Sequence, residues 1–197
     1  MKVTGANIIG GNPKNGRVTD DWYATSPEAV EKLLSIHEFK GQYILEPCVG
    51  MGHIADVLEW FFGSNVTAID IVDRGYPNVI IEDFLKWKPD KKYDTIITNP
   101  PYCLASEFIF KCMDLLCAGG QLAMFLKIQF LEGQKRKALF SKYPPKYVYV
   151  FRARVPVFNS GMAYNPETGK KWQTLMCFAW YVWEWGFCGE PVIRWID

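Results

Sequence analysis

The sequence predicts an α/β fold in which a mostly parallel, seven-stranded sheet carries helices on both faces. Short apolar runs alternate with segments of helical spacing through the first two thirds of the chain. The apolar runs contain few polar positions, which is typical of parallel strands that are covered on both sides. The early runs end in polar or turn residues, as strands do where an α/β sheet carries a ligand site at its carboxyl edge.

The helices have recognisable starts and ends. The first is expected to begin at Pro27, behind a hydroxyl cap, because proline suits the first helical turn, and to extend to about residue 38. Gly119 and Gly120 end the helix expected at 105–117. The remaining helices are expected at 53–62 and 132–141.

The strands are separated by these helices and by turns. They are expected at 43–45, 66–70, 79–83, 93–98, 121–128, 146–151 and 174–183. The first four end at Glu46, Asp70, Asp83 and Asn99. Because ligands bind at the carboxyl ends of parallel strands, these four polar side chains should converge on one cleft.

Length and composition favour one globular domain over residues 1–197. Of the 197 residues, 49% are hydrophobic and 16% aromatic, which excludes a disordered chain. Residues 1–22 are expected to form an arm and 159–171 a polar loop beside the substrate. No apolar run reaches the ~18–20 residues of a membrane helix, and no signal peptide is evident, so a cytoplasmic location is expected. Six cysteines without a Cys-x-x-Cys pair, and only two histidines, predict no metal site.

Charge is unevenly distributed, although the net charge is only +1. Residues 127–171 contain ten Lys and Arg against two Glu, a net +8, so the rest of the chain carries −7. This asymmetry indicates a polyanionic partner, although a solvated surface explains charge alone equally well. The substrate-binding residues expected from this stretch are Lys127, Arg152, Arg154, Lys170 and Lys171.

Gly50 and Gly52 follow the first strand and allow the backbone to approach a ligand closely. Asp70, at the end of the next strand, can accept hydrogen bonds from both hydroxyls of a ribose. The third glycine of a dinucleotide fingerprint is missing from residues 53–56. The pattern therefore favours a nucleoside cofactor other than NAD.

Four segments of the chain form a further pattern: residues 23–28, Glu46-Pro47-x-x-Gly50-x-Gly52, Glu82-Asp83-Phe84 and Asn99-Pro100-Pro101-Tyr102. They resemble segments of S-adenosylmethionine-dependent amino-group methyltransferases, and most specifically of the small phage-like N6-adenine DNA methyltransferases. The resemblance covers roughly residues 22–130. It implies a Rossmann-like methyltransferase fold with S-adenosylmethionine as cofactor. Together with the strand-end position of Asp70, the resemblance gives the residues expected to bind the cofactor: Tyr23, Thr25, Glu46, Pro47, Gly50, Gly52, Asp70, Asp83, Phe84 and Asn99. In this assignment Asp83 accepts a hydrogen bond from the cofactor's adenine amine, and Phe84 stacks on its ring.

The most specific motif is Asn99-Pro100-Pro101-Tyr102, which matches the catalytic motif of that family. An exocyclic amine is a poor nucleophile because its lone pair is delocalised into the ring. The Asn99 side-chain oxygen and the Pro100 carbonyl can accept hydrogen bonds from both of its N–H groups and localise that lone pair, while Pro101 stiffens the turn. Tyr102 can stack on the target base.

The resemblance implies methylation of adenine N6 in DNA. The same motif leaves RNA adenine, a glutamine side chain of a protein, or a catalytically silent binding module as alternatives. The basic stretch favours nucleic acid. No separate recognition domain is evident, which predicts a short recognition site or loose selectivity.

Overall fold

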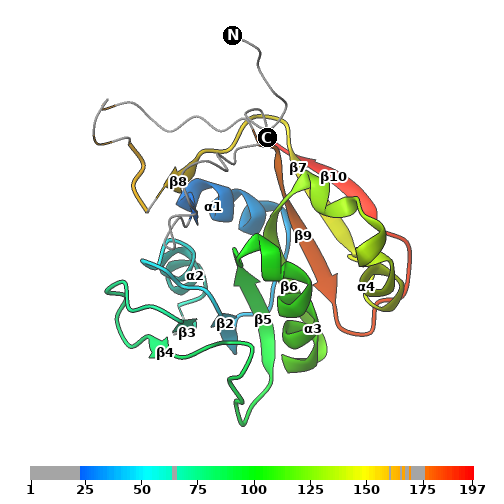
Figure 1. Cartoon of the computed structure of the whole chain (residues 1–197), viewed down its shortest axis with the longest axis horizontal. Helices are drawn as coiled ribbons and strands as arrows, with labels where there is room; N and C mark the ends of the chain where they lie inside the picture. Colours follow the sequence, from blue (N-terminus) through cyan, green and yellow to red (C-terminus); the bar gives the residue numbers. More distant parts are fainter. Residues whose placement is uncertain (1–22, 64–65, 160, 165, 167–168, 170–175) are drawn as a thin grey trace.

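The computed structural model describes residues 23–63, 66–159, 161–164, 166, 169 and 176–197 (Figure 1). Its main sheet has eight strands in the order β10-β7-β9-β6-β5-β2-β3-β4. They are β2 Ile44–Glu46, β3 Val66–Asp70, β4 Ile80–Ile81, β5 Tyr93–Thr98, β6 Leu116–Lys127, β7 Tyr147–Phe151, β9 Phe178–Glu184 and β10 Val192–Ile196. All neighbours pair in parallel except β9, which is antiparallel to both β6 and β7.

The predicted α/β class and mostly parallel sheet are confirmed, but the expected number of seven strands is wrong by one. The additional strand is β10, which pairs in parallel with β7 at the edge of the sheet. Four of its five residues are exposed, so it lacks the alternation of buried and exposed positions by which a strand is recognised.

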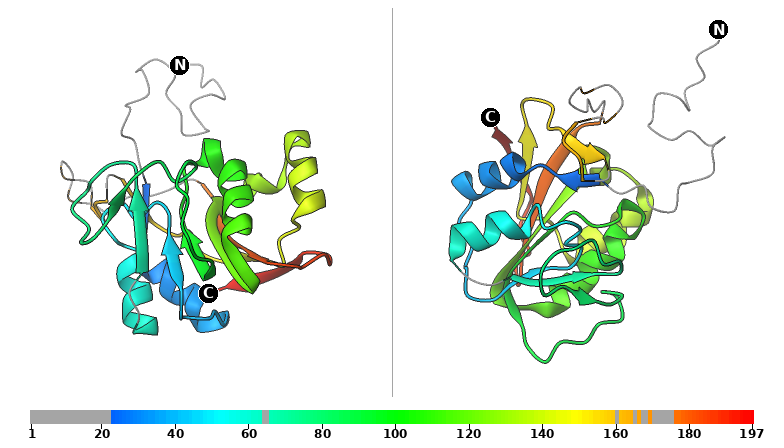
Figure 2. Two further views of the ribbon diagram at one scale, coloured as in Figure 1. Left: turned by 90° about the horizontal axis from the view of Figure 1, so that it is seen from below. Right: turned by 90° about the vertical axis from the view of Figure 1, so that its left-hand side faces the viewer.

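Helices cover both faces of the sheet, as predicted (Figure 2). They are α1 Pro27–Ile36, α2 Ala55–Phe62, α3 Ala105–Leu115 and α4 Lys137–Lys142. Successive side chains of a strand point to opposite faces of a sheet. In β6, Phe125 packs in the apolar cluster that includes residues of α1 and α2, whereas Met124 packs in the apolar cluster that includes residues of α3 and α4. The sheet is therefore the central layer between two apolar cores.

The elements differ from the expectation in several places. The helix expected at 105–117, with Gly119 and Gly120 as its end, stops at Leu115, and β6 begins at Leu116 and includes both glycines. The strand expected at 79–83 is reduced to β4, and the helix expected at 132–141 becomes the 3-10 turn η4 Gln134–Arg136 followed by α4. Two further 3-10 turns, η2 Tyr102–Leu104 and η3 Ile128–Leu131, follow β5 and β6. Both β5 and β6 thus end in tight turns at the same edge of the sheet.

A small antiparallel ribbon stands outside the main sheet. It pairs β1 (Tyr23–Thr25) with β8 (Val157–Asn159), so the segment before α1 lies beside the segment after β7. Among the described residues, no helix is both long and apolar enough to cross a bilayer.

Candidate active site at the carboxyl edge of the sheet

The strand order brings most of the predicted site residues to one edge. Because β2, β3, β5 and β6 run in the same direction, their carboxyl ends meet there. Glu46, Asp70 and Lys127 are the last residues of β2, β3 and β6, and Asn99 directly follows β5. β7 runs in the same direction, so Arg152, which follows it, lies farther along the same edge.

The glycine loop after β2 is shaped by contacts with β3 and with Tyr76. The Gly50 N–H donates to Asp70 Oδ2 at 2.8 Å, and the Gly52 carbonyl accepts from the Asp56 N–H at 2.8 Å in the turn that begins α2. Gly52 has φ +93°, and a Cβ there would lie 2.3 Å from the Tyr76 ring. Only glycine fits this close approach.

Glu46 is a buried carboxyl group, only 1% exposed. Burial raises the pKa of this carboxyl well above its usual value, an effect that a backbone hydrogen bond from Ala55 opposes and the nearby Asp70 and Asp56 reinforce. Its Oε2 has no hydrogen-bond partner. Since buried polar atoms are nearly always paired in native proteins, this oxygen is suited to a polar ligand.

Two more unpartnered polar atoms lie where β1 ends and α1 begins. The hydroxyl groups of Thr25 and Ser26 are buried and make no hydrogen bond. Ser26 is the N-cap of α1, but its side chain does not cap the helix, contrary to the expected hydroxyl cap. The two hydroxyls are thus held away from solvent but remain available as donors and acceptors.

The Asn99 amide has a defined orientation. Its Nδ2 donates to the Tyr23 carbonyl at 2.7 Å. A carbonyl only accepts, so the NH₂ group must face Tyr23, and Oδ1 faces away from it as an acceptor. In the same turn Pro100 is buried and Pro101 exposed.

Tyr102, the last residue of the motif, lies beside Lys127 at the end of β6. Its hydroxyl group is buried without a hydrogen bond of normal geometry, although Asn99 is near enough to influence its pKa, which burial raises. The Lys127 ammonium lies over the ring, 5.1 Å from its centroid, and the Phe178 ring centroid is 6.1 Å away. Burial also lowers the pKa of Lys127.

Asp70 is 8% exposed and accepts three hydrogen bonds. They come from the Gly50 N–H, the Val72 N–H at 3.0 Å and Arg74 Nη1 at 2.9 Å. Its carboxylate therefore joins the glycine loop to the turn after β3.

The segment after β4 carries Asp83 and Phe84. Phe84 is 3% exposed and packs against Phe108 with ring centroids 4.9 Å apart, so its ring belongs to the core rather than to an open surface. Asp83 accepts from the Leu85 N–H at 3.0 Å and pairs with Lys86 at 3.1 Å. The pair with Lys86 holds the pKa of Asp83 below its usual value.

The basic residues that follow β7 line a hollow of about 220 Å³ at the same edge. Arg152 pairs with Asp197 at 2.8 Å, and Arg154 donates to Cys177 Sγ at 2.7 Å. Arg152, Arg154 and Phe178 all line this hollow. Lys170 and Lys171 lie outside the described residues, as do the arm 1–22 and positions 160, 165, 167 and 168 of the polar loop.

Sequence reasoning missed the ribbon that completes the site. Tyr23 pairs with Asn159, and its carbonyl accepts the hydrogen bond from Asn99. The ring centroid of Phe158 in β8 lies 5.6 Å from that of His53, which follows the glycine loop. Both strands have three residues, too few for a recognisable period. No signal in the sequence indicates their pairing.

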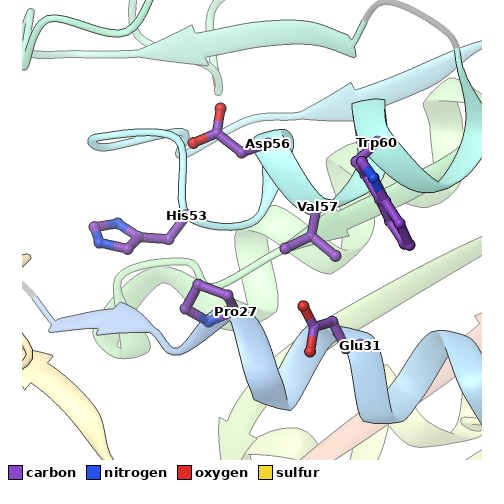
Figure 3. Close-up of a pocket in the computed structure, with 6 residues that line it drawn as sticks. All are labelled: Pro27, Glu31, His53, Asp56, Val57 and Trp60. Carbon is purple, nitrogen blue, oxygen red and sulfur yellow. The ribbon is translucent and has the colours of Figure 1, made fainter.

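A second hollow of about 220 Å³ lies between α1 and α2 (Figure 3). It is lined by Pro27, Glu31, His53, Asp56, Val57 and Trp60. None of the predicted cofactor or catalytic residues lines it, although His53 directly follows Gly52 in the glycine loop. Within the described ranges, no group of three His, Cys, Asp or Glu side chains is placed to hold a metal ion.

No protein-family profile matches the chain. A type II methyltransferase, M.CvrRI of Paramecium bursaria Chlorella virus XZ-6E, is 26% identical in an alignment that covers 68% of this chain and 48% of that protein. The chain thus spans about half the length of this curated relative.

Solved structures share the fold at low identity. A predicted O-methyltransferase from Agrobacterium tumefaciens has a TM-score of 0.62 at 14% identity, over 86% of this chain and 85% of that one. The type IIG restriction endonuclease BpuSI has a TM-score of 0.60 at 15% identity, over 90% of this chain and 27% of that one. An S-adenosylmethionine-dependent O-methyltransferase from Thermotoga maritima has a TM-score of 0.55 at 17% identity, over 83% and 67%. The chain has the fold of the class I S-adenosylmethionine-dependent methyltransferases, and its sequence is similar to that of a type II methyltransferase.

Proposed function

We propose that the chain transfers the methyl group of S-adenosylmethionine to the exocyclic N6 amine of adenine in DNA. The observation that carries the proposal is the fixed Asn99 amide, whose Nδ2 is held by the Tyr23 carbonyl so that Oδ1 is left as an acceptor. This acceptor follows β5, at the edge where the other strand ends meet. An amide fixed before the substrate binds need not reorient during the reaction.

The chain's own residues fit the cofactor. The unpartnered Glu46 Oε2 and the Thr25 and Ser26 hydroxyls supply polar atoms for an amino-acid moiety. Gly50 and Gly52 permit close approach of the backbone, and Asp70 suits ribose hydroxyls. When bound, S-adenosylmethionine supplies an electrophilic methyl group on sulfur.

The residues of the motif then prepare the nucleophile. Asn99 Oδ1 and the Pro100 carbonyl accept hydrogen bonds from the two N–H groups of the amine, which localises the nitrogen lone pair for attack. No covalent bond to the protein forms, so no nucleophilic cysteine takes part. The bond from sulfur to the methyl group would break as the bond to nitrogen forms, which releases neutral S-adenosylhomocysteine. The nitrogen, then cationic, would lose one of its protons to solvent.

Tyr102 and Lys127 are positioned to receive the base. The ammonium of Lys127 already lies over the Tyr102 ring. We expect the target adenine to stack on Tyr102 once it has left the duplex, with Lys127 moving aside toward the DNA backbone. Base extrusion costs a few kcal/mol, which phosphate contacts at the same edge offset.

DNA is favoured over the alternatives by two kinds of support. Arg152 and Arg154 line a hollow at the edge that carries Asn99, and phosphate contacts come mainly from such side chains. The chain also resembles a type II methyltransferase and shares its fold with a type IIG restriction endonuclease. RNA adenine and a protein glutamine remain the alternatives, because both present a planar conjugated amine.

The proposal is tested by methyl transfer from labelled S-adenosylmethionine to duplex DNA, RNA and protein in parallel. Nucleosides released from the labelled product are separated and compared with N6-methyladenosine and its deoxy form. Label in N6-methyldeoxyadenosine is the expected result. Label only in methylglutamine, or only in RNA, would replace DNA by the corresponding alternative.

A further inference from the structure

The Asp70 carboxylate is almost fully engaged by protein donors. A carboxylate offers about four acceptor positions on its two oxygens. Oδ1 accepts from the Val72 N–H and from Arg74, and Oδ2 accepts from the Gly50 N–H. One position therefore remains, on Oδ2, whereas a ribose presents two hydroxyl groups.

The three donors differ in their freedom to leave. The Gly50 N–H belongs to the glycine loop, against which the Tyr76 ring packs closely at Gly52. The Val72 N–H closes a local turn with the Asp70 side chain, two residues before it. Arg74 reaches Asp70 through a long, rotatable side chain from four residues away. It is the donor that can release Oδ1 without a change in the backbone.

The Arg74–Asp70 pair is also more than a surface ion pair. The side chains are 18% and 10% exposed. The contact is consequently screened less by solvent than an exposed pair would be, so releasing Arg74 has a measurable cost.

We infer that Arg74 is a specificity-determining residue for the nucleoside end of the cofactor, because it competes with the second ribose hydroxyl for Oδ1 of Asp70. This inference rests on the proposed use of S-adenosylmethionine. Full engagement of the ribose requires Arg74 to leave Oδ1. When one hydroxyl is missing from the ligand, Arg74 can return to the acceptor and offset the loss.

The test measures the coupling between Arg74 and a ligand hydroxyl by calorimetry. The probes are S-adenosylhomocysteine and its 2′-deoxy and 3′-deoxy analogues, titrated into the full chain and into Arg74→Met, which keeps most of the aliphatic stem. A hydrogen bond to a charged group corresponds to about tenfold or more in affinity. We expect Arg74→Met to bind S-adenosylhomocysteine about tenfold more tightly. Loss of the hydroxyl that competes with Arg74 should weaken binding by about tenfold in the variant but by about threefold or less in the parent.

Lys32→Met is the matched control, because Lys32 forms an ion pair of the same four-residue spacing with Glu28 on α1. It should bind all three ligands as the parent does. Arg74→Ala, which also removes the stem, should show the same coupling as Arg74→Met, and circular dichroism verifies that each variant is folded.

Two results would overturn the inference: weaker binding of S-adenosylhomocysteine to folded Arg74→Met, or equal losses for each deoxy analogue in parent and variant. Either would leave the proposed cofactor intact, because the parent still binds the probe. Absence of binding to the parent itself would instead contradict the proposed function, and the inference would fail with it.

Discussion

Replacing Gly52 with alanine tests how Tyr76 shapes the loop beside the proposed cofactor site. Two costs add. Alanine at φ +93° adopts a conformation that L-residues avoid, at about 1–2 kcal/mol. Its Cβ would lie 2.3 Å and 2.5 Å from two carbons of the Tyr76 ring, which is only 8% exposed and cannot swing freely into solvent. Overpacking of this kind costs about 1–3 kcal/mol, so the free energy of unfolding should fall by about 2–5 kcal/mol.

Gly63 provides the matched control at the other end of α2. It also has a positive φ, +61°, but no atom of the described residues lies within 4 Å of the position that an alanine methyl group would take there. Gly63→Ala should therefore cost only the backbone component of about 1–2 kcal/mol. Urea denaturation of both variants gives the comparison. In a Tyr76→Ala background, Gly52→Ala should lack the overpacking component and cost only the backbone component relative to Tyr76→Ala alone. Equal destabilisation by the two glycine substitutions would refute the proposed role of the Tyr76 contact.

Three further predictions concern the site itself. Glu46→Gln should become increasingly stable relative to the parent as pH rises above the ordinary glutamate pKa of 4.5. The reason is that the unfolded parent chain then loses a proton that the buried carboxyl of the folded parent retains. Urea midpoints at pH 5 and pH 8 measure this difference in stability. Tyr102→Phe should leave the free energy of unfolding unchanged or higher, since it removes a buried hydroxyl without a partner, whereas Tyr102→Ala should weaken DNA binding by about 1–3 kcal/mol. Neutralising Arg152 and Arg154 together should lower the magnitude of the log–log salt slope of duplex binding by up to about 1.8, at about 0.9 per phosphate contact, while S-adenosylhomocysteine binding stays constant.

Each of these predictions has an outcome that contradicts it. Parallel stability curves for Glu46→Gln and the parent would mean that the carboxyl does not hold its proton on folding. A marked loss of stability in Tyr102→Phe would reveal a hydrogen bond to the hydroxyl group. An unchanged salt slope in the double arginine variant, equal to that of the Lys32→Gln control, would place the phosphate contacts elsewhere.

Strands with buried side chains and polar ends could be predicted well from the sequence. The bounds of β3 and β5 were predicted at the residues where the structure has them, because apolar runs stop there at Asp70 and Asn99. The edge strand β10 was missed, since its exposed side chains show no alternation. Local patterning is informative only where one face of a strand is buried.

The site was predictable where it depends on motifs and unpredictable where it depends on contacts between distant segments. The sequence indicates Asn99 as the amide acceptor, but not the Tyr23 carbonyl that orients it, 76 residues away. It indicates Asp70, but not the competing Arg74, because a four-residue spacing outside a helix does not fix where the side chain points. Phe84 carries an aromatic ring that suits stacking, yet burial against Phe108 was decided by tertiary packing.

Activation of an exocyclic amine by Asn99 is measured by single-turnover methyl transfer to duplex DNA by the parent and by Asn99→Ala. Binding of S-adenosylhomocysteine to both proteins is measured alongside. We expect N6-methyldeoxyadenosine from the parent and a rate lower by about 10²-fold or more in the variant, with similar affinity for the probe. Unchanged methyl transfer by Asn99→Ala would show that the Asn99 amide does not activate the amine.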